Sequence, residues 1–183
     1  MTVGSFRFEA LHTPGPTPEH LVFKVFQDEN LIEKAKQIFW NAVNDKVLND
    51  YDLSAKSSVD KLTWMCLDLV NRDNVEEVNN ITNNINTVKI NSLPESIIDL
   101  KGKYGYFYEY STSNLNDVEK IIDIKIQTLT YFGVNKNKLF DIVYNAGKIG
   151  IDRIVPIGSA LEMGIIWDGY DMIYSLTKII DLK

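Results

Sequence analysis

Ile126-Gln127-Thr128-Leu129-Thr130-Tyr131-Phe132-Gly133-Val134 has the β-branched and aromatic composition of a strand. Asn135 follows it and can cap a helix that continues through Val143, and Gly147 stands where a glycine commonly ends a helix. Residues 151–157 are again apolar and of strand length. A strand, a helix and a strand in this order predict a crossover connection between two parallel strands.

Other parts of the chain alternate in the same way. The segments predicted as strands are residues 21–26, 87–90 and 104–110. The segments predicted as helices are residues 28–43, 57–70, 114–122 and 170–182. We therefore expect an α/β fold with a mainly parallel sheet and helices on both faces.

Two of these helices carry apolar residues at helical spacing, which predicts one buried face on each. On the helix that starts at Ser57 or Ser58, the predicted buried residues are Val59, Leu62, Cys66, Leu69 and Val70. On the last helix they are Met172, Ile173, Leu176, Ile179 and Ile180.

The length and composition predict one domain. The chain has 183 residues, of which 45% are apolar, enough for one well-packed core and too few for two ordinary domains. Residues 1–20 contain Pro14, Pro16 and Pro18, which lack N–H donors, so we expect an N-terminal arm or loop there. The α/β domain is then residues 21–183.

Charge and residue usage exclude several function classes. The net charge of −6 disfavours binding to nucleic acid, and a single cysteine with two histidines leaves no basis for a disulfide or a metal cluster. No apolar run is long enough to span a membrane, and no signal peptide is visible. We expect a cytoplasmic protein whose partner is a small molecule or another protein.

Three segments resemble the end of LuxC-type acyl-CoA reductases. They are Ile126 to Val134 as quoted above, Gly150-Ile151-Asp152-Arg153-Ile154-Val155-Pro156-Ile157-Gly158, and Trp167-Asp168-Gly169-Tyr170-Asp171. Ala35-Lys36-Gln37-Ile38-Phe39-Trp40 and Val59-Asp60-Lys61-Leu62-Thr63 resemble the family's region just after its catalytic loop. The resemblance runs in order from about residue 20 to the end.

The resemblance implies a fold like the catalytic domain of aldehyde dehydrogenases and the reduction of fatty acyl-CoA to aldehyde with NADPH. In that family a cysteine thiolate takes the acyl group as a thioester, and hydride transfer releases the aldehyde. Family members are about twice as long as this chain. The part that is similar here lies beyond their nucleotide-binding region.

The sequence departs from the family at the nucleophile. The family's cysteine precedes the strand that resembles residues 21–26, where this chain has Gly15-Pro16-Thr17-Pro18-Glu19. A threonine hydroxyl is not ionised without a paired base, so Thr17 does not replace a thiolate. Cys66 is expected to be buried and unreactive. We therefore expect no catalytic residue in this chain and no activity from the chain alone.

Arg153 and Asp168 lie in two of the similar segments and are the candidates for substrate binding, because guanidinium groups suit phosphates such as those of CoA. The alternative is structural: an ion pair or a cap for Arg153, and a turn for Asp168-Gly169.

No Gly-x-Gly-x-x-Gly follows a predicted strand, so we expect the chain itself to bind no cofactor, although the family uses NADPH. Expected partners are acyl-CoA and either a second copy of the chain or a nucleotide-binding partner domain, with association through residues 104–110. The alternative function is a non-catalytic oligomerisation or protein-interaction domain.

Overall fold

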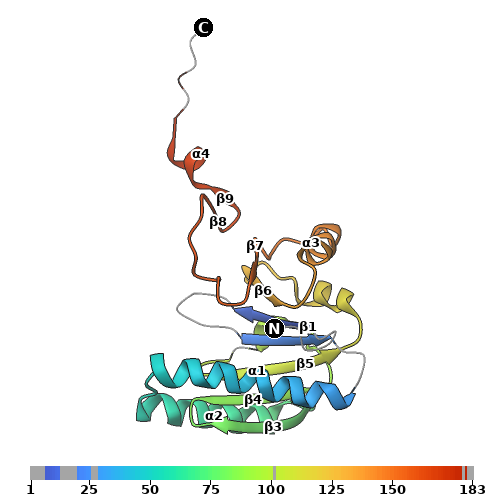
Figure 1. Ribbon diagram of the computed structural model, residues 1–183, viewed down its shortest axis with the longest axis vertical. Coiled ribbons are helices and arrows are strands. Elements are labelled where there is room, and N and C mark those ends of the chain that lie inside the picture. Colours follow the sequence, from blue (N-terminus) through green and yellow to red (C-terminus); the bar gives the residue numbers. More distant parts are fainter. Residues whose placement is uncertain (1–6, 13–19, 26–28, 101, 179, 181–183) are drawn as a thin grey trace.

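The computed structural model describes residues 7–12, 20–25, 29–100, 102–178 and 180 (Figure 1). A seven-stranded sheet has the order β3-β4-β5-β2-β1-β6-β7. Its strands are β1 Arg7–His12, β2 His20–Val25, β3 Val75–Thr82, β4 Ile85–Ile90, β5 Tyr106–Thr112, β6 Thr128–Phe132 and β7 Arg153–Pro156. A separate hairpin pairs β8 Ile166–Trp167 with β9 Tyr170–Asp171.

The helices vary in length and type. The α-helices are α1 Glu29–Asp50, α2 Ala55–Asn71, α3 Lys136–Asn145 and α4 Met172–Leu176. The 3-10 segments are η1 Ile97–Asp99 and η2 Leu115–Ile121. In Figure 1, α1 and α2 lie at the β3 to β5 end of the sheet, and α3 lies beside β6 and β7. No helix of the described segments is long and apolar enough to cross a membrane.

The prediction of a mainly parallel sheet with helices on both faces, as in an aldehyde dehydrogenase catalytic domain, is wrong. The pairs β2–β5, β4–β5 and β6–β7 are parallel, but β1–β2, β1–β6 and β3–β4 are antiparallel. Short links decide the directions of β1–β2 and β3–β4. Residues 13–19 and the two residues Asn83 and Asn84 are too few for a crossover, which takes a dozen residues or more.

Strand β1 was not predicted. It falls in residues 1–20, where a loop or arm was expected, yet it lies between β2 and β6 and pairs with both. Phe8 and Ala10 alternate with Arg7 and Glu9, a strand pattern that the neighbouring prolines obscured. The proline run at 13–18 lies outside the described residues.

Strand β5 organises the core because its side chains alternate between the two faces of the sheet. Tyr106 and Tyr108 are buried with Val88, Ile121 and Leu129 in the larger cluster, on the side of α2 and η2. Phe107 points to the other face, where its ring lies 4.9 Å from that of Trp40 on α1. The prediction that residues 104–110 form an association surface is therefore wrong, because Tyr106 and Tyr108 are each only 1% exposed.

Helix α2 forms where it was predicted, but the prediction of its buried face is wrong. Val59, Leu62, Leu69 and Val70 are exposed, and so is Cys66. The buried residues of this helix are the polar Lys61 and Asp68. The reason is that both have hydrogen-bond partners, Lys61 in the turn between β3 and β4 and Asp68 among the buried tyrosines, which removes most of the cost of burying a polar group.

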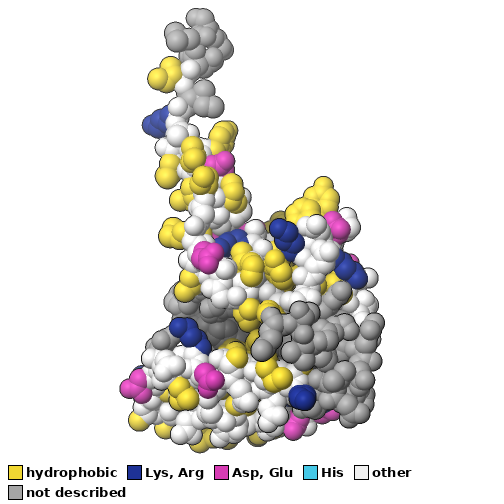
Figure 2. Space-filling view, viewed as in Figure 1, with side chains coloured by type: hydrophobic (Ala, Val, Ile, Leu, Met, Phe, Trp, Pro, Cys, Tyr) yellow, Lys and Arg dark blue, Asp and Glu magenta, His cyan; other side chains and the backbone are white. Residues whose placement is uncertain are grey.

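The last predicted helix is also shorter than expected. α4 covers only Met172–Leu176, capped by Asp171, whose side chain accepts a hydrogen bond from the backbone N–H of Tyr174 at 2.9 Å. Ile173, Leu176 and Ile180 are exposed rather than buried. Figures 1 and 2 show this segment extending from the body of the protein with hydrophobic side chains along it. Ile179 lies outside the described residues.

Candidate functional site

Arg153, the first residue of β7, binds the backbone of its own chain. Its two terminal nitrogens donate to the carbonyl oxygens of Ala160 at 2.7 Å and Glu162 at 2.8 Å. The guanidinium carbon also lies 4.4 Å from the centre of the Trp167 ring, a cation–π contact. The two hydrogen bonds of Arg153 therefore attach the segment after β7 to the sheet, and its contact with Trp167 places the hairpin β8–β9 beside that segment.

Asp168 lies in the two-residue turn of this hairpin. Asp168 and Gly169 have φ values of 51° and 78°, the left-handed region that two-residue hairpin turns of type I′ require at both positions. A Cβ on Gly169 would lie 3.1 Å from Oδ1 of Asp152, so the turn is close to the start of β7. Oδ1 of Asp168 is buried without a hydrogen-bond partner among the described residues.

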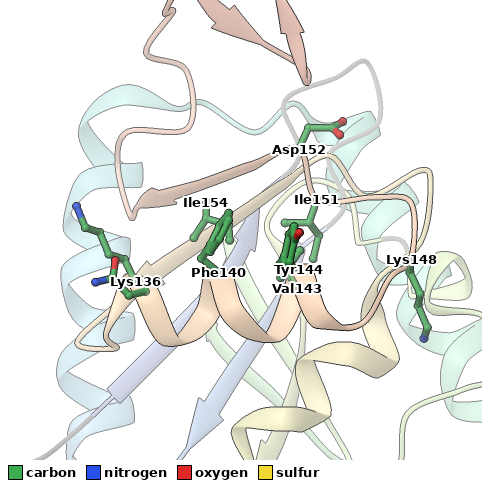
Figure 3. A pocket seen from close by; sticks show the side chains of 9 residues that line it. Lys136, Phe140, Val143, Tyr144, Lys148, Ile151, Asp152 and Ile154 are labelled. Carbon is green, nitrogen blue, oxygen red and sulfur yellow. The ribbon is translucent and has the colours of Figure 1, made fainter.

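A groove of about 520 Å³ lies between α3 and β7 (Figure 3). It is lined by Lys136, Asn137, Phe140, Val143, Tyr144, Lys148, Ile151, Asp152 and Ile154. Figure 3 shows Lys136 and Lys148 at its two ends, with Phe140 and Tyr144 between them. The two aromatic rings are stacked, with centres 5.8 Å apart and planes at 17°.

The local sequence explains how the groove forms. The side chain of Asn135 caps α3 by accepting from the backbone N–H of Asn137 at 2.9 Å, as predicted, and Gly147 has the positive φ of 60° that suits a helix end. Leu139 and Ile142 are buried and hold the helix against the core. The opposite side of α3 remains open to solvent.

The lysines of the groove differ in how they are held. Nζ of Lys148 donates to the carbonyl oxygen of Glu119 at 2.8 Å. Lys136 is exposed at the start of α3 and has no hydrogen bond or ion pair to another described residue. It is therefore available for an anionic ligand, next to two exposed aromatic rings.

The structure brings the predicted site residues into one region without joining them directly. Arg153 contacts Trp167, the neighbour of Asp168, but no ion pair connects Arg153 with Asp168 within the described segments. Sequence reasoning missed the groove beside them. Its signal was the regular spacing of four that places Lys136, Phe140 and Tyr144 in one row along α3, with Lys148 just beyond the end of the helix.

Two buried carboxylates elsewhere are structural. Asp68 accepts from the hydroxyls of Tyr106, at 2.9 Å, and Tyr108, and from Nε of Arg72 at 2.7 Å. Burial, and to a lesser extent contact with Asp68, raises the pKa of both tyrosines far above their usual range, so neither hydroxyl ionises near neutral pH.

Glu109, on the other face of the sheet, pairs with Lys36 at 2.6 Å and accepts from Nε1 of Trp40. Both buried carboxylates thus attach helices to β5 and are not open to a substrate. No three histidine, cysteine, aspartate or glutamate side chains converge as metal ligands in the part of the chain that the structure describes.

Comparison with protein-family models, with curated proteins and with solved structures finds no match to this chain.

Proposed function

We propose that this chain is the C-terminal portion of a LuxC-type acyl-CoA reductase, and that the groove between α3 and β7 holds the CoA end of a fatty acyl-CoA. The observation that carries the proposal is that the three segments with the resemblance form neighbouring elements of the fold. The segments 126–134, 150–158 and 167–171, which carry the resemblance, supply β6, β7 and the hairpin β8–β9, and Arg153 links the last two.

The chemistry of the groove suits this ligand. CoA combines several phosphate charges with a flat adenine ring, and lysines bind phosphates while aromatic rings stack on bases. Lys136 and Lys148 supply positive charge, and Phe140 and Tyr144 supply exposed rings between them. Ile151 and Ile154 give the groove an apolar floor.

On this proposal Arg153 and Asp168 act indirectly. The terminal nitrogens of Arg153 are occupied by two carbonyl oxygens, so its role is to hold the hairpin beside the groove. Asp168 shapes the turn at the hairpin tip. Lys136 and Lys148 make the direct contacts with CoA.

The chain binds acyl-CoA on this proposal but does not reduce it alone. Cys66 is exposed on α2, at the opposite end of the sheet from the groove in Figure 1, so it is not placed to take an acyl group from a ligand there. The NADPH site belongs to a nucleotide-binding partner domain, with which the chain associates, and the cysteine that the family carries before the strand resembling residues 21–26 is missing from this chain.

Titration calorimetry with CoA tests the proposal. We expect the Lys136→Gln variant to bind CoA about tenfold more weakly than the unchanged chain, because a hydrogen bond to a charged group contributes about 1.5–3 kcal/mol. Lys138→Gln is the matched control: it removes the same charge from the same helix, but Lys138 does not line the groove.

Unchanged affinity in the Lys138→Gln variant together with weaker binding in Lys136→Gln supports the groove. Equal weakening in both variants would mean that CoA binding depends only on the overall charge, and no heat of binding in the unchanged chain would contradict the proposal.

A second candidate function, a non-catalytic oligomerisation domain, is favoured by the apolar side chains that α2 exposes.

A further inference from the structure

Helix α2 is oriented with its apolar side toward solvent. Six of its large apolar side chains are between 41% and 82% exposed: Val59, Leu62, Trp64, Leu67, Leu69 and Val70. We call these six residues the α2 stripe. Monomeric proteins rarely leave a contiguous apolar patch of more than a few hundred Å² in water.

The contacts on the inner side of α2 fix this orientation. Nζ of Lys61 donates to the carbonyl oxygen of Asn83 in the β3–β4 turn, and Asp68 receives the hydroxyls of Tyr106 and Tyr108. Rotating the helix to bury the stripe would turn Asp68 toward solvent and leave the hydroxyls of Tyr106 and Tyr108 buried without an acceptor, at a cost of about 1–3 kcal/mol for each hydroxyl. The stripe is therefore a stable feature of this surface.

We propose that the α2 stripe is a dimer interface, in which α2 packs antiparallel against α2 of a second copy of this chain. The stripe is close to symmetric along the helix: Val59 and Leu62 lie before Trp64, and Leu69 and Val70 lie after Leu67. A two-fold axis near the middle of the helix brings the first half of one stripe onto the second half of the other, as an isologous contact requires.

Charges at the helix ends fit the same arrangement. Lys56 lies near the start of α2 and Asp73 just beyond its end, and both are exposed. In the antiparallel pair each Lys56 meets Asp73 of the other copy, which gives two ion pairs at the rim. A parallel pair would instead place Lys56 beside Lys56, where like charges repel.

The size of the stripe also agrees with a second copy. α2 has 17 residues and is about 25 Å long at 1.5 Å per residue, enough for the centre of an interface of about 800 Å² per partner. The net charge of −6 on each copy opposes association, but salt screens it beyond about 8 Å.

This interface does not depend on the proposed CoA site. α2 lies at the β3 to β5 end of the sheet, whereas α3 and the groove lie at the β6 to β7 end (Figure 1). Loss of one property with the other intact therefore separates the two proposals.

Sedimentation equilibrium of the full chain between 1 and 100 µM, on the order of the concentrations at which specific dimers form, tests the interface. We expect a dimer of twice 20.9 kDa for the unchanged chain and a dissociation constant at least tenfold higher for Leu62→Glu. Leu48→Glu is the control, because Leu48 is 60% exposed on α1 and Leu62 is 54% exposed on α2. It should dimerise like the unchanged chain.

A charge exchange tests the antiparallel direction. Lys56→Glu and Asp73→Lys should each weaken the dimer, and the double variant should restore it. Circular dichroism confirms that each variant is folded, and Val70→Glu, at an 82% exposed position, replaces Leu62→Glu if that variant does not fold. A monomer at every concentration would overturn the proposal. So would a Leu62→Glu dimer of unchanged affinity, which would move the interface to another surface such as the C-terminal segment.

Discussion

Asp68 shows how a single polar residue decides the orientation of a whole helix. It lies on α2 at a position surrounded in sequence by leucines and a valine, yet it is buried because it receives two tyrosine hydroxyls and the Arg72 guanidinium. Burial lowers the pKa of Arg72, but the hydrogen bond that Arg72 donates to Asp68, together with the charges of Tyr108, Asp68 and Asp99, outweighs this effect, so the pKa of Arg72 is raised and the cation persists. A charged pair with two further donors is favourable inside a protein.

The raised pKa values of the tyrosines predict how stability depends on pH. Burial and the bond to Asp68 raise the pKa of Tyr108 in the folded state above the value of 10.0 that it has when unfolded. The unfolded chain therefore loses these protons first, and stability that is fully present below pH 10 is lost as the pH rises above it. We expect the free energy of unfolding to fall progressively as the pH rises from about 10 toward the raised pKa of the folded state.

The Tyr108→Phe variant should lower the free energy of unfolding at pH 7 by about 1–3 kcal/mol, because a hydrogen bond to a carboxylate is lost. It should also lose less stability above pH 10 than the unchanged chain, since one buried hydroxyl no longer ionises. Urea unfolding at pH 7 and pH 10.5, on the two sides of the usual tyrosine pKa of about 10, measures both effects. Identical pH slopes for the two proteins would contradict this account of Tyr108.

At the scale of elements, the hairpin β8–β9 depends on the left-handed backbone of Gly169. Its φ of 78° strains any residue with a side chain, and a Cβ there would lie 3.1 Å from Asp152 Oδ1. We expect Gly169→Ala to loosen the hairpin by about 1 kcal/mol, measured as faster amide hydrogen exchange in residues 166–171.

Gly164→Ala is the control for this change. Gly164 has no positive φ, and the nearest atom to a Cβ there is a backbone oxygen at 3.6 Å, an ordinary contact. Exchange in the hairpin should stay unchanged in this variant. Equal exchange in both variants would show that the turn does not need its glycine.

The elements also show which parts of the structure could be predicted from sequence. α3 was predicted correctly with both of its ends, because Asn135 and Gly147 act locally. The buried face of α2 was not predicted correctly, because hydrophobic periodicity assumes that apolar residues lie inside. The orientation of α2 is instead set by the hydrogen bonds of Lys61 and Asp68 to residues distant in sequence. β1 and the mixed sheet depend on pairing between distant strands, which no local pattern encodes.

The surroundings of Arg153 and Asp168 could not be predicted from sequence for the same reason. Arg153 and Asp168 do lie in one region, but Arg153 is occupied by Ala160 and Glu162, contacts that form only when the segment after β7 folds back. The groove residues Lys136 and Tyr144 become neighbours of β7 only through the packing of α3. The spacing of four between Lys136, Phe140 and Tyr144 is visible in the sequence, but the strand that this row faces is not.

At the scale of the whole molecule, two surfaces at opposite ends of one sheet have different properties. The groove at the β6 to β7 end carries two lysines, one aspartate and two exposed aromatic rings, whereas the α2 stripe at the β3 to β5 end consists of apolar side chains. We assign ligand binding to the first and association to the second. Because the two surfaces lie at opposite ends of the strand order (Figure 1), a dimer through α2 leaves both grooves open to solvent.

The central claim is that the region of the three convergent segments binds CoA, and chemical-shift mapping by NMR during titration with CoA tests it most directly. We predict that the backbone amides that shift belong to α3, to β7 and to the hairpin β8–β9, and that those of α2 do not shift. Shifts spread evenly over the surface, centred on α2, or absent at saturating CoA would contradict the claim.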